Sequence, residues 1–532
     1  MVASDAALAT QAGVEILASG GNAVDAAVTT ALVLAVVFPT AGNLGGGGFL
    51  VARVDGKAHA LDFRETAPLA ATHDMYKTPD GKPSTESRDG WRAVGVPGSV
   101  AGLWEAWHTL GSKRKTWPEL VAPAIAFAEK GFVVDAAFVG TIDVVKQRLA
   151  KDPASAGLFL PNGAPPAVGT TWRNPELAQV LRRIADQGPQ GFYEGPVADA
   201  VARAMKKGGG FVTAADLHAY HAKWREPLDY AYRGKKVIGM PLPSSGGLTM
   251  AMIAHILDGY DLRAKGWHSP EQVHLSVEAM RRAFAARNEK LGDPDFVKNP
   301  EEELLSPGWA ERARASIRAD RATPSKDILP PSASAPRDGP HTTHLSVVDP
   351  DGNAVAMTTT LNLWFGAGVT VPGLGVVLND EMDDFSSVPG SPNAFGLVQG
   401  EPNAIAPGKR MLSSMSPTIV LGPDEKVELV LGGAGGSRII TTVFEEMSNA
   451  LDFGMNASDA VRAPRFHQQD LPDILMLEPR ALSEETTNAL RAMGHETKEA
   501  GHLADAPAIG RDGGLWIGAA EPRREGSLAL GL

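Results

Sequence analysis

The chain has 532 residues, a mass of 55.9 kDa and a formal net charge of -12 at pH 7. This length calls for several domains or one large layered domain, and the negative charge excludes nucleic acid as an expected partner. The absence of cysteine excludes disulfides, thiol nucleophiles and thiolate metal sites, so any nucleophile must carry oxygen or nitrogen.

We expect no signal peptide at the start of this chain, and a mature or truncated form stays open. Residues 1–17 lack a basic region followed by a small-residue cleavage site, so we predict no signal peptide in this chain. The most apolar run, 26–38, is shorter than the roughly 20 residues that a membrane-spanning helix needs. We therefore expect a buried helix there and no membrane span.

A helical hairpin is predicted first. Ser4 and Asp5 can cap a helix running to about Ala18, and a second helix should end near Val37. Two apolar stretches around Asp55-Gly56, at 50–54 and 58–63, then predict a hairpin of strands. From about residue 100 to 305 the pattern is mainly helical, with amphipathic segments at 117–130, 175–187 and 270–291.

The character of the chain changes after residue 320. The segment 321–341 is rich in proline, serine and alanine and has no periodic apolar face, so it is expected to be mobile. Strand-like segments at 342–348 and 354–361 follow, joined by a cluster of turn-forming residues. Further predicted elements are strands at 375–378, 416–421 and 427–431 and a helix at about 439–451.

A threonine at the start of a strand, directly after a flexible segment, suggests one kind of nucleophile. If the His341–Thr342 bond is cut, Thr342 gains a free α-amine beside its own hydroxyl, and that amine can act as the general base. Thr360 falls near Thr342 across the predicted hairpin and could hold the hydroxyl in place. The alternative is a pair of ordinary strand threonines, and sequence alone does not set the register.

Two further segments could take part in catalysis or ligand binding, and each has more than one interpretation. The run 431–438, glycine-rich at 432–436, leads from a strand into a helix, so its N–H groups could form an oxyanion hole, a phosphate cradle or a plain turn. It does not match the nucleotide-binding motifs. The acidic run 379–385 could bind a metal or an ammonium group, or be a solvated loop. His341 and His344 should point to opposite faces of a strand, and no metal-binding motif occurs, so we expect no metal and no cofactor.

The order and spacing of many motifs resemble those of the γ-glutamyltranspeptidase (glutathione hydrolase) family of N-terminal-nucleophile (Ntn) hydrolases. The resemblance covers nearly the whole chain. It rests on GNAVDAA, AGNLGGGGF, DFRETAP, VPGSVAGLWEAW, ADLHAY, PLPSSGG, TTHLSVVDPDGNAVAMTTTLN, LNDEMDDF, MLSSMSPTIV, GGAGGSRIITT and APRFHQQ.

This resemblance implies an α+β fold, a four-layer αββα sandwich built jointly by two subunits cut from one precursor. The large subunit would be 1–341 and the small catalytic subunit 342–532, held together as a heterodimer. Thr342 would first cut the chain before itself and later attack the substrate. Thr360 would hydrogen-bond the nucleophile, and Gly435 and Gly436 would form the oxyanion hole.

The resemblance also implies two sets of ligands for the zwitterionic end of a γ-glutamyl group. Its α-carboxylate would be bound by Arg64, Ser413 and Ser414. A planar guanidinium suits this role because it pairs with a carboxylate through two hydrogen bonds. Its α-ammonium would be bound by Asn362, Glu381 and Asp384.

Two features depart from the family pattern. Phe395, in the loop 389–400 over the site, stands where many bacterial members have a tyrosine, so a hydroxyl that could latch the loop is missing. The run 363–366 after Asn362 is bulkier and more apolar than expected, which leaves the acceptor preference open.

The predicted activity is hydrolysis or transfer of the γ-glutamyl group of glutathione and related compounds, with water, an amino acid or a peptide as acceptor. The alternatives are a glutaryl-type cephalosporin acylase of the same family, which Asp384 opposes, and an uncleaved, inactive binding homologue. By analogy with the family the protein would be periplasmic or secreted, and a cytoplasmic location stays open.

Overall fold

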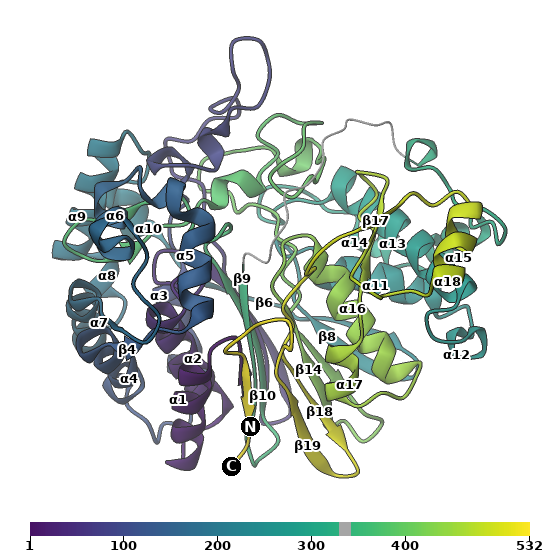
Figure 1. Ribbon diagram of the computed structural model, residues 1–532, viewed down its shortest axis with the longest axis horizontal. Helices are drawn as coiled ribbons and strands as arrows, with labels where there is room; N and C mark the ends of the chain where they lie inside the picture. The colour runs from purple at the N-terminus through teal and green to yellow at the C-terminus, as the bar shows by residue number, and fades with distance from the viewer. Residues whose placement is uncertain (329–341) are drawn as a thin grey trace.

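The structure, a computed structural model, describes residues 1–328 and 342–532. Two β-sheets lie face to face at its centre, and a layer of helices covers the outer side of each sheet (Figure 1). The expected four-layer αββα sandwich is confirmed. In the described part of the chain, no helix is both long and apolar enough to cross a membrane.

The first sheet is built from both ends and the middle of the chain. Every neighbouring pair of its strands is antiparallel. In spatial order its seven strands are β20 (Leu528–Leu530), β1 (Val2–Ser4), β9 (Thr342–Val348), β10 (Ala354–Thr360), β2 (Gly47–Val54), β3 (Lys57–Phe63) and β6 (Lys223–Arg225).

The second sheet is also antiparallel. In spatial order its six strands are β19 (Leu515–Ala519), β18 (Ala508–Asp512), β14 (Val427–Leu431), β13 (Thr418–Leu421), β8 (Lys235–Gly239) and β7 (Leu228–Tyr232).

Alternating side chains of the central strands supply two separate cores. Phe49 and Val51 of β2 join the core between the sheets, whereas Leu50 joins the core under the first helix layer. Because successive strand residues point to opposite faces, a strand buried on both sides needs apolar residues on both faces. This explains the continuous apolar runs 49–52 of β2 and 354–357 of β10.

Helices pack directly on the outer side of each sheet. On the first sheet lie α1 (Ala7–Ala18), α2 (Ala23–Val37) and α3 (Ser99–Leu110), and α4 (Trp117–Lys130) packs on α2. On the second sheet lie α11 (Gly246–Leu257), α16 (Arg438–Leu451) and α17 (Ala457–Arg462), and α13 (Pro270–Lys290) packs on α11.

Further elements complete the two sides. Beyond the first layer lie α5 (Ala136–Leu149), α6 (Pro153–Phe159), α7 (Pro175–Gln187), α8 (Gln190–Tyr193), α9 (Gly195–Gly208) and α10 (Ala214–Ala219). On the other side lie α12 (Leu262–Lys265), α14 (Glu301–Leu304), α15 (Pro307–Ala315) and α18 (Glu484–Ala492). Small sheets are formed by β4 (Phe132–Val133) with β5 (Thr171–Trp172), by β11 (Thr370–Val371) with β12 (Val376–Val377), and by β15 (Phe466–His467), β16 (Leu475–Leu477) and β17 (Thr497–Glu499).

The predicted cap of the first helix is wrong. Ser4 belongs to β1, and α1 begins only at Ala7, with Ala6 at its N-cap and no capping side chain. Pairing of β1 with β9 and β20 outweighs the local preference of serine and aspartate for a helix start. Asp5 instead accepts a hydrogen bond from the Thr343 hydroxyl, at 2.8 Å.

The segment 321–341, predicted to be mobile, is described only as far as residue 328. Within 321–328, Ser325 is buried, its hydroxyl donates to the Asp470 carbonyl at 2.8 Å, and Arg281 donates to the same hydroxyl at 2.7 Å. This described part of the segment is therefore anchored to the protein at Ser325. The rest of the predicted segment, 329–341, lies outside the described residues.

Candidate active site

The hairpin of β9 and β10 places two threonine hydroxyls together. Thr342 is the first residue of β9, and the register pairs it with Thr360, the last residue of β10. Their Oγ atoms are 3.3 Å apart, and Thr342 is only 6% exposed. The backbone N–H of Asn362 donates to the Thr360 hydroxyl at 2.8 Å, which fixes that oxygen. The structure thus supplies the register that the sequence left open.

His344, two residues along β9, offers no base to this pair of hydroxyls. Its ring nitrogens bond Thr358 Oγ at 2.8 Å and Ser346 Oγ at 3.1 Å. Burial lowers the pKa of His344 to about 3, so the ring is neutral at physiological pH. His344 is a structural residue of the inter-sheet layer.

The glycine-rich run 432–436 connects β14 to α16 beside Thr342. Gly436 has φ of +61°, and a Cβ at this position would lie 2.4 Å from the Phe395 ring, so only glycine fits. Ala434 exchanges two backbone hydrogen bonds with Asp505, at 2.6 and 2.8 Å, which anchors the run. Among the described residues, no acceptor pairs with the N–H of Gly435 or Gly436. Two unused donors are what an oxyanion hole requires.

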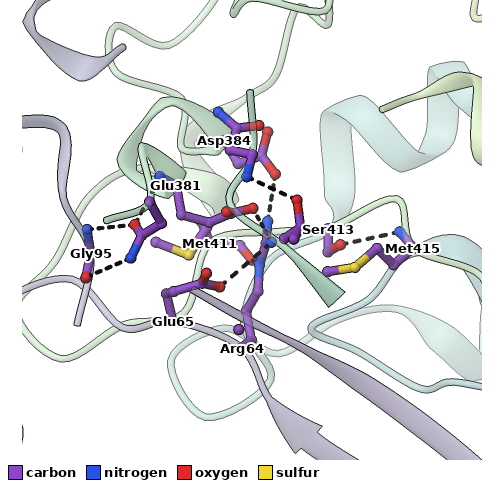
Figure 2. Close-up of polar contacts among 12 residues, drawn as sticks. Arg64, Glu65, Gly95, Glu381, Asp384, Met411, Ser413 and Met415 are labelled. Carbon is purple, nitrogen blue, oxygen red and sulfur yellow. Dashed lines mark hydrogen bonds and ion pairs between the residues drawn. The ribbon is translucent and has the colours of Figure 1, made fainter. Parts of the chain in front are cut away.

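A buried charge cluster forms the other end of the site. Arg64 directly follows β3, and Glu381 and Asp384 bound the short 3-10 helix η5 (Glu381–Asp384). The Arg64 guanidinium donates to both carboxylates, and its Nε donates to the Met411 carbonyl at 3.2 Å (Figure 2). The residues expected to bind opposite ends of a zwitterion therefore pair with one another here.

The Asn379 side-chain amide anchors the start of the acidic run. The Asn379 side chain donates to the Gly95 carbonyl and accepts from the Gly95 N–H, both at 2.9 Å. It also accepts from the Glu381 N–H at 3.1 Å. This clamp ties η5 to the segment just before α3 and contributes to holding the acidic run inside the protein.

Burial strongly perturbs these groups. Burial raises the pKa of Glu381 and of Asp384, and the positive charge of Arg64 opposes the rise. Burial likewise raises the pKa of neighbouring Glu65, to about 7. For Arg64, burial alone would lower the pKa, but the three carboxylates outweigh it and raise the pKa. The cluster thus holds one firmly charged guanidinium among acids that favour a proton or a cation.

Ser413, Ser414 and Asn362 complete the predicted set. The Ser413 hydroxyl accepts from the Met415 N–H at 3.1 Å, and the Ser414 hydroxyl accepts from Arg287 at 3.1 Å. The Asn362 side chain donates to the Asp380 carbonyl at 3.0 Å, and its backbone has φ of +74°. All three residues are buried.

One cavity brings nearly all of these residues together. Gly435 is the one predicted site residue that does not line it. The predicted residues in its wall are Arg64, Thr342, Thr360, Asn362, Glu381, Asp384, Ser413, Ser414 and Gly436. Phe395 also lines it, whereas the bulky run 363–366 does not, since Phe365 is buried in the core against Phe159.

Sequence reasoning missed several wall residues. They are Arg287, Leu397, Leu412, Met415, Ser437 and Ile439. Ser437 directly follows the glycine run and Leu412 and Met415 flank the two serines, so proximity to known motifs could have identified them. Arg287 lies in a helix with many charged residues, and nothing in that pattern sets it apart.

Another group of possible metal ligands lies away from this cavity, at His274, Glu278 and His495. The two imidazoles bond each other at 2.8 Å, and Glu278 accepts from Arg282 at 2.7 Å and from the Thr323 N–H at 2.9 Å. Two guanidinium groups, of Arg281 and Arg282, adjoin the glutamate. Such a neighbourhood opposes a cation, and the group serves to tie α13 to the segments that cover it.

The αββα sandwich, with a threonine at the start of a central strand, defines the class of Ntn hydrolases. Within that class, the chain belongs to the γ-glutamyltranspeptidase family. That family's sequence model matches residues 9–531.

Two curated relatives are glutathione hydrolase proenzymes. The protein of Pseudomonas sp. (strain A14) is 47% identical and is matched over 100% of this chain and 94% of its own length. The protein of Escherichia coli (strain K12) is 45% identical, over 100% and 91% respectively. Among solved structures, the cephalosporin acylase of Bacillus halodurans superposes with a TM-score of 0.86 at 29% identity, covering 99% of this chain and 94% of that one.

Proposed function

We propose that the protein cleaves γ-glutamyl amides, such as that of glutathione, through an ester between the γ-glutamyl group and Thr342. The observation that carries this proposal is the cavity itself. It has the Thr342 hydroxyl at one end and both signs of buried charge, from Arg64, Glu381 and Asp384, at the other. The two proenzymes named for glutathione hydrolysis support the same substrate class.

The first step is self-cleavage. The Thr342 Oγ attacks the carbonyl carbon of His341, and breakage of the C–N bond moves the acyl group to this oxygen and frees the Thr342 amine. Water then hydrolyses the ester, which releases the carboxylate of residue 341 and restores the Thr342 hydroxyl. Fragments 1–341 and 342–532 result, and they remain together as a heterodimer. The word proenzyme in the names of both relatives supports processing of this kind.

In turnover, the new α-amine takes the proton of the Thr342 hydroxyl as its oxygen attacks the γ-carbonyl. The oxyanion of the tetrahedral intermediate accepts hydrogen bonds from the N–H groups of Gly435 and Gly436. Collapse transfers the proton to the leaving amine and forms the ester. Water then gives hydrolysis, and an amino acid or peptide gives transfer.

Charge balance favours a γ-glutamyl over a glutaryl group. A substrate carboxylate that pairs with Arg64 draws the guanidinium away from Glu381 and Asp384. The buried acids then need a cation, which the α-ammonium supplies and a glutaryl group does not. Release of p-nitroanilide from γ-glutamyl and glutaryl substrates compares the two directly, and faster glutaryl turnover would identify an acylase.

The test of the nucleophile is N-terminal sequencing of the purified protein after SDS gel electrophoresis. We expect a small fragment beginning Thr-Thr-His-Leu-Ser. Thr342→Ala should remain one chain and show no turnover. Normal fragments from that variant would refute self-cleavage, and an active preparation containing only the intact chain would refute the whole proposal. Export to the periplasm or medium belongs to the same proposal and is tested by fractionating the native host.

A further inference from the structure

A second arginine, Arg287, faces the cavity and donates its hydrogen bonds there to neutral groups. Arg287 of α13 is 1% exposed and lines the same cavity as Thr342. Its guanidinium donates to four neutral oxygens: those of Ser245 at 2.9 Å, Asn288 at 2.8 Å, Gln399 at 3.2 Å and Ser414 at 3.1 Å. Among the residues that the structure describes, no carboxylate lies within ion-pair distance of it.

A buried charge without a counter-ion is costly, so its retention calls for an explanation. Burial lowers the pKa of Arg287 to about 10, and nearby Asp384 partly opposes this effect. The guanidinium is therefore still charged at neutral pH. A cavity wall that keeps an unneutralised positive charge is suited to an anionic group.

In the hydrogen bond between Arg287 and Ser414, the donor and the acceptor can be assigned. A guanidinium only donates, so the oxygen of Ser414 must be the acceptor in their contact. The single hydroxyl proton of Ser414 then points elsewhere, and it has no acceptor among the described residues. Since Ser414 lines the cavity, that proton is available to an acceptor on a bound molecule.

Arg287 also braces the backbone next to Ser414. Its Nε donates to the Ser245 hydroxyl, and that hydroxyl in turn donates to the Ser413 carbonyl at 2.6 Å. The Ser245 N–H donates to the same carbonyl at 2.8 Å. One side chain thus fixes both the hydroxyl and the backbone position of the serine pair.

We propose that Arg287 is a positioning residue for the carboxylate of the donor substrate: it turns the Ser414 hydroxyl proton into the cavity and adds a fixed positive charge behind it. This inference rests on the proposed function, since it concerns the carboxylate of the γ-glutamyl group. Arg64 would then pair with the carboxylate directly, while Arg287 acts through Ser414.

The test compares Arg287→Met with wild type on two anilides. γ-Glutamyl-p-nitroanilide carries both the carboxylate and the ammonium group, whereas 4-aminobutyryl-p-nitroanilide lacks the carboxylate. We expect kcat/KM to fall about 30-fold for the first and less than about threefold for the second, as for loss of a hydrogen bond to a charged group. Arg287→Lys should restore part of the loss. An equal fall for both substrates would overturn the proposal.

A double-mutant cycle with Ser414→Ala gives a second measurement, which is decisive even if the 4-aminobutyryl anilide reacts too slowly. If Arg287 acts through Ser414, the double variant should be hardly slower on the γ-glutamyl anilide than Arg287→Met alone. Effects that multiply would overturn the proposal.

Arg282→Met is the matched control, because Arg282 is another buried arginine of α13 whose hydrogen bonds lie away from the cavity. Arg282→Met should lower the melting temperature and should change kcat/KM for the two anilides by the same factor. Rates are expressed per processed enzyme, so that a folding or processing defect is not counted as a loss of binding. Wild-type turnover of the γ-glutamyl anilide tests the proposed function, and the ratio of variant to wild type tests Arg287.

Discussion

The Thr342 hydroxyl is positioned by a neighbour that is itself held in place. Thr360 Oγ lies 3.3 Å away and is anchored by the Asn362 N–H. A hydrogen bond of this kind can hold the proposed nucleophile in an attacking rotamer, which lowers the barrier to reaction without changing substrate affinity.

Thr360→Val removes this contact with little change in shape. We expect kcat to fall about tenfold and KM to change less, since one hydrogen bond contributes on the order of 1 kcal/mol. Steady-state assays with γ-glutamyl-p-nitroanilide, expressed per processed enzyme, measure the effect. Thr359→Val is the control, because the Thr359 hydroxyl donates to the Gly47 carbonyl at 2.9 Å. Equal losses of kcat in both variants would argue against a role for Thr360.

At the scale of elements, the glycine-rich run and the loop above it fit together. The Phe395 ring occupies the space where a side chain at residue 436 would be. The loop 389–400 therefore packs on the glycine-rich run through an aromatic ring.

Gly436→Ala should disrupt this fit. The new methyl group would clash with Phe395, and φ of +61° is unfavourable for alanine. The peptide should shift and weaken the oxyanion hole, lowering kcat about 100-fold. Gly408→Ala is the control: its φ is +73°, but a Cβ there meets no atom within 4 Å. A variant at 436 no slower than the one at 408 would contradict the assigned role.

At the scale of the molecule, the two proposed subunits are interleaved. In the first sheet, β1 lies between β9 and β20, and β2 pairs with β10. In the second sheet, β8 pairs with β13. The two segments thus share both sheets and the core between them, which is an interface of the obligate kind.

Cleaved protein should therefore behave as one complex. Both fragments should co-elute from a size-exclusion column in native buffer, at the position of uncut Thr342→Ala, because separating them exposes strand edges and core side chains. They should separate only in denaturant. A free fragment in native buffer would contradict the shared-sheet arrangement.

The Asp5 carboxyl joins distant parts of the chain and should make stability depend on pH. Burial, reinforced by the negative charge of Asp505, raises the pKa of Asp5 to about 7 from 3.8. Between these values the folded state binds more protons than the unfolded state, so this group costs stability as the pH rises. Above pH 7 the Asp5 carboxyl is ionised in both states, so the loss of folding stability is complete.

Asp5→Asn removes that titration and still offers an oxygen to Thr343. The melting temperature of the variant minus that of wild type should increase from pH 5 to pH 8, by on the order of a few degrees. Thermal unfolding followed by circular dichroism at several pH values tests this expectation. A difference that stays constant with pH would show that Asp5 does not titrate in this range.

Local patterns were sufficient to predict much of this protein. The segments 117–130 and 175–187 coincide with α4 and α7, and β9 begins at Thr342 as expected, because periodicity and turn residues act over a few positions. The ordered motifs also identified the family. Local pattern failed at Ser4, where strand pairing with residues more than 300 positions away decided the conformation.

Tertiary structure alone decided the pairing of Thr342 with Thr360, the contact of Arg64 with Glu381 and Asp384, and the burial of Arg287. Each depends on the register of strands or the packing of helices far apart in sequence, where a shift of one residue would turn a side chain to the opposite face. Burial then set the charges, since the same carboxylates in a solvated loop would keep their ordinary pKa values. The sequence therefore predicted most of the residue types that line the cavity, whereas only the tertiary structure determined their charge states and their hydrogen-bond and ion-pair partners.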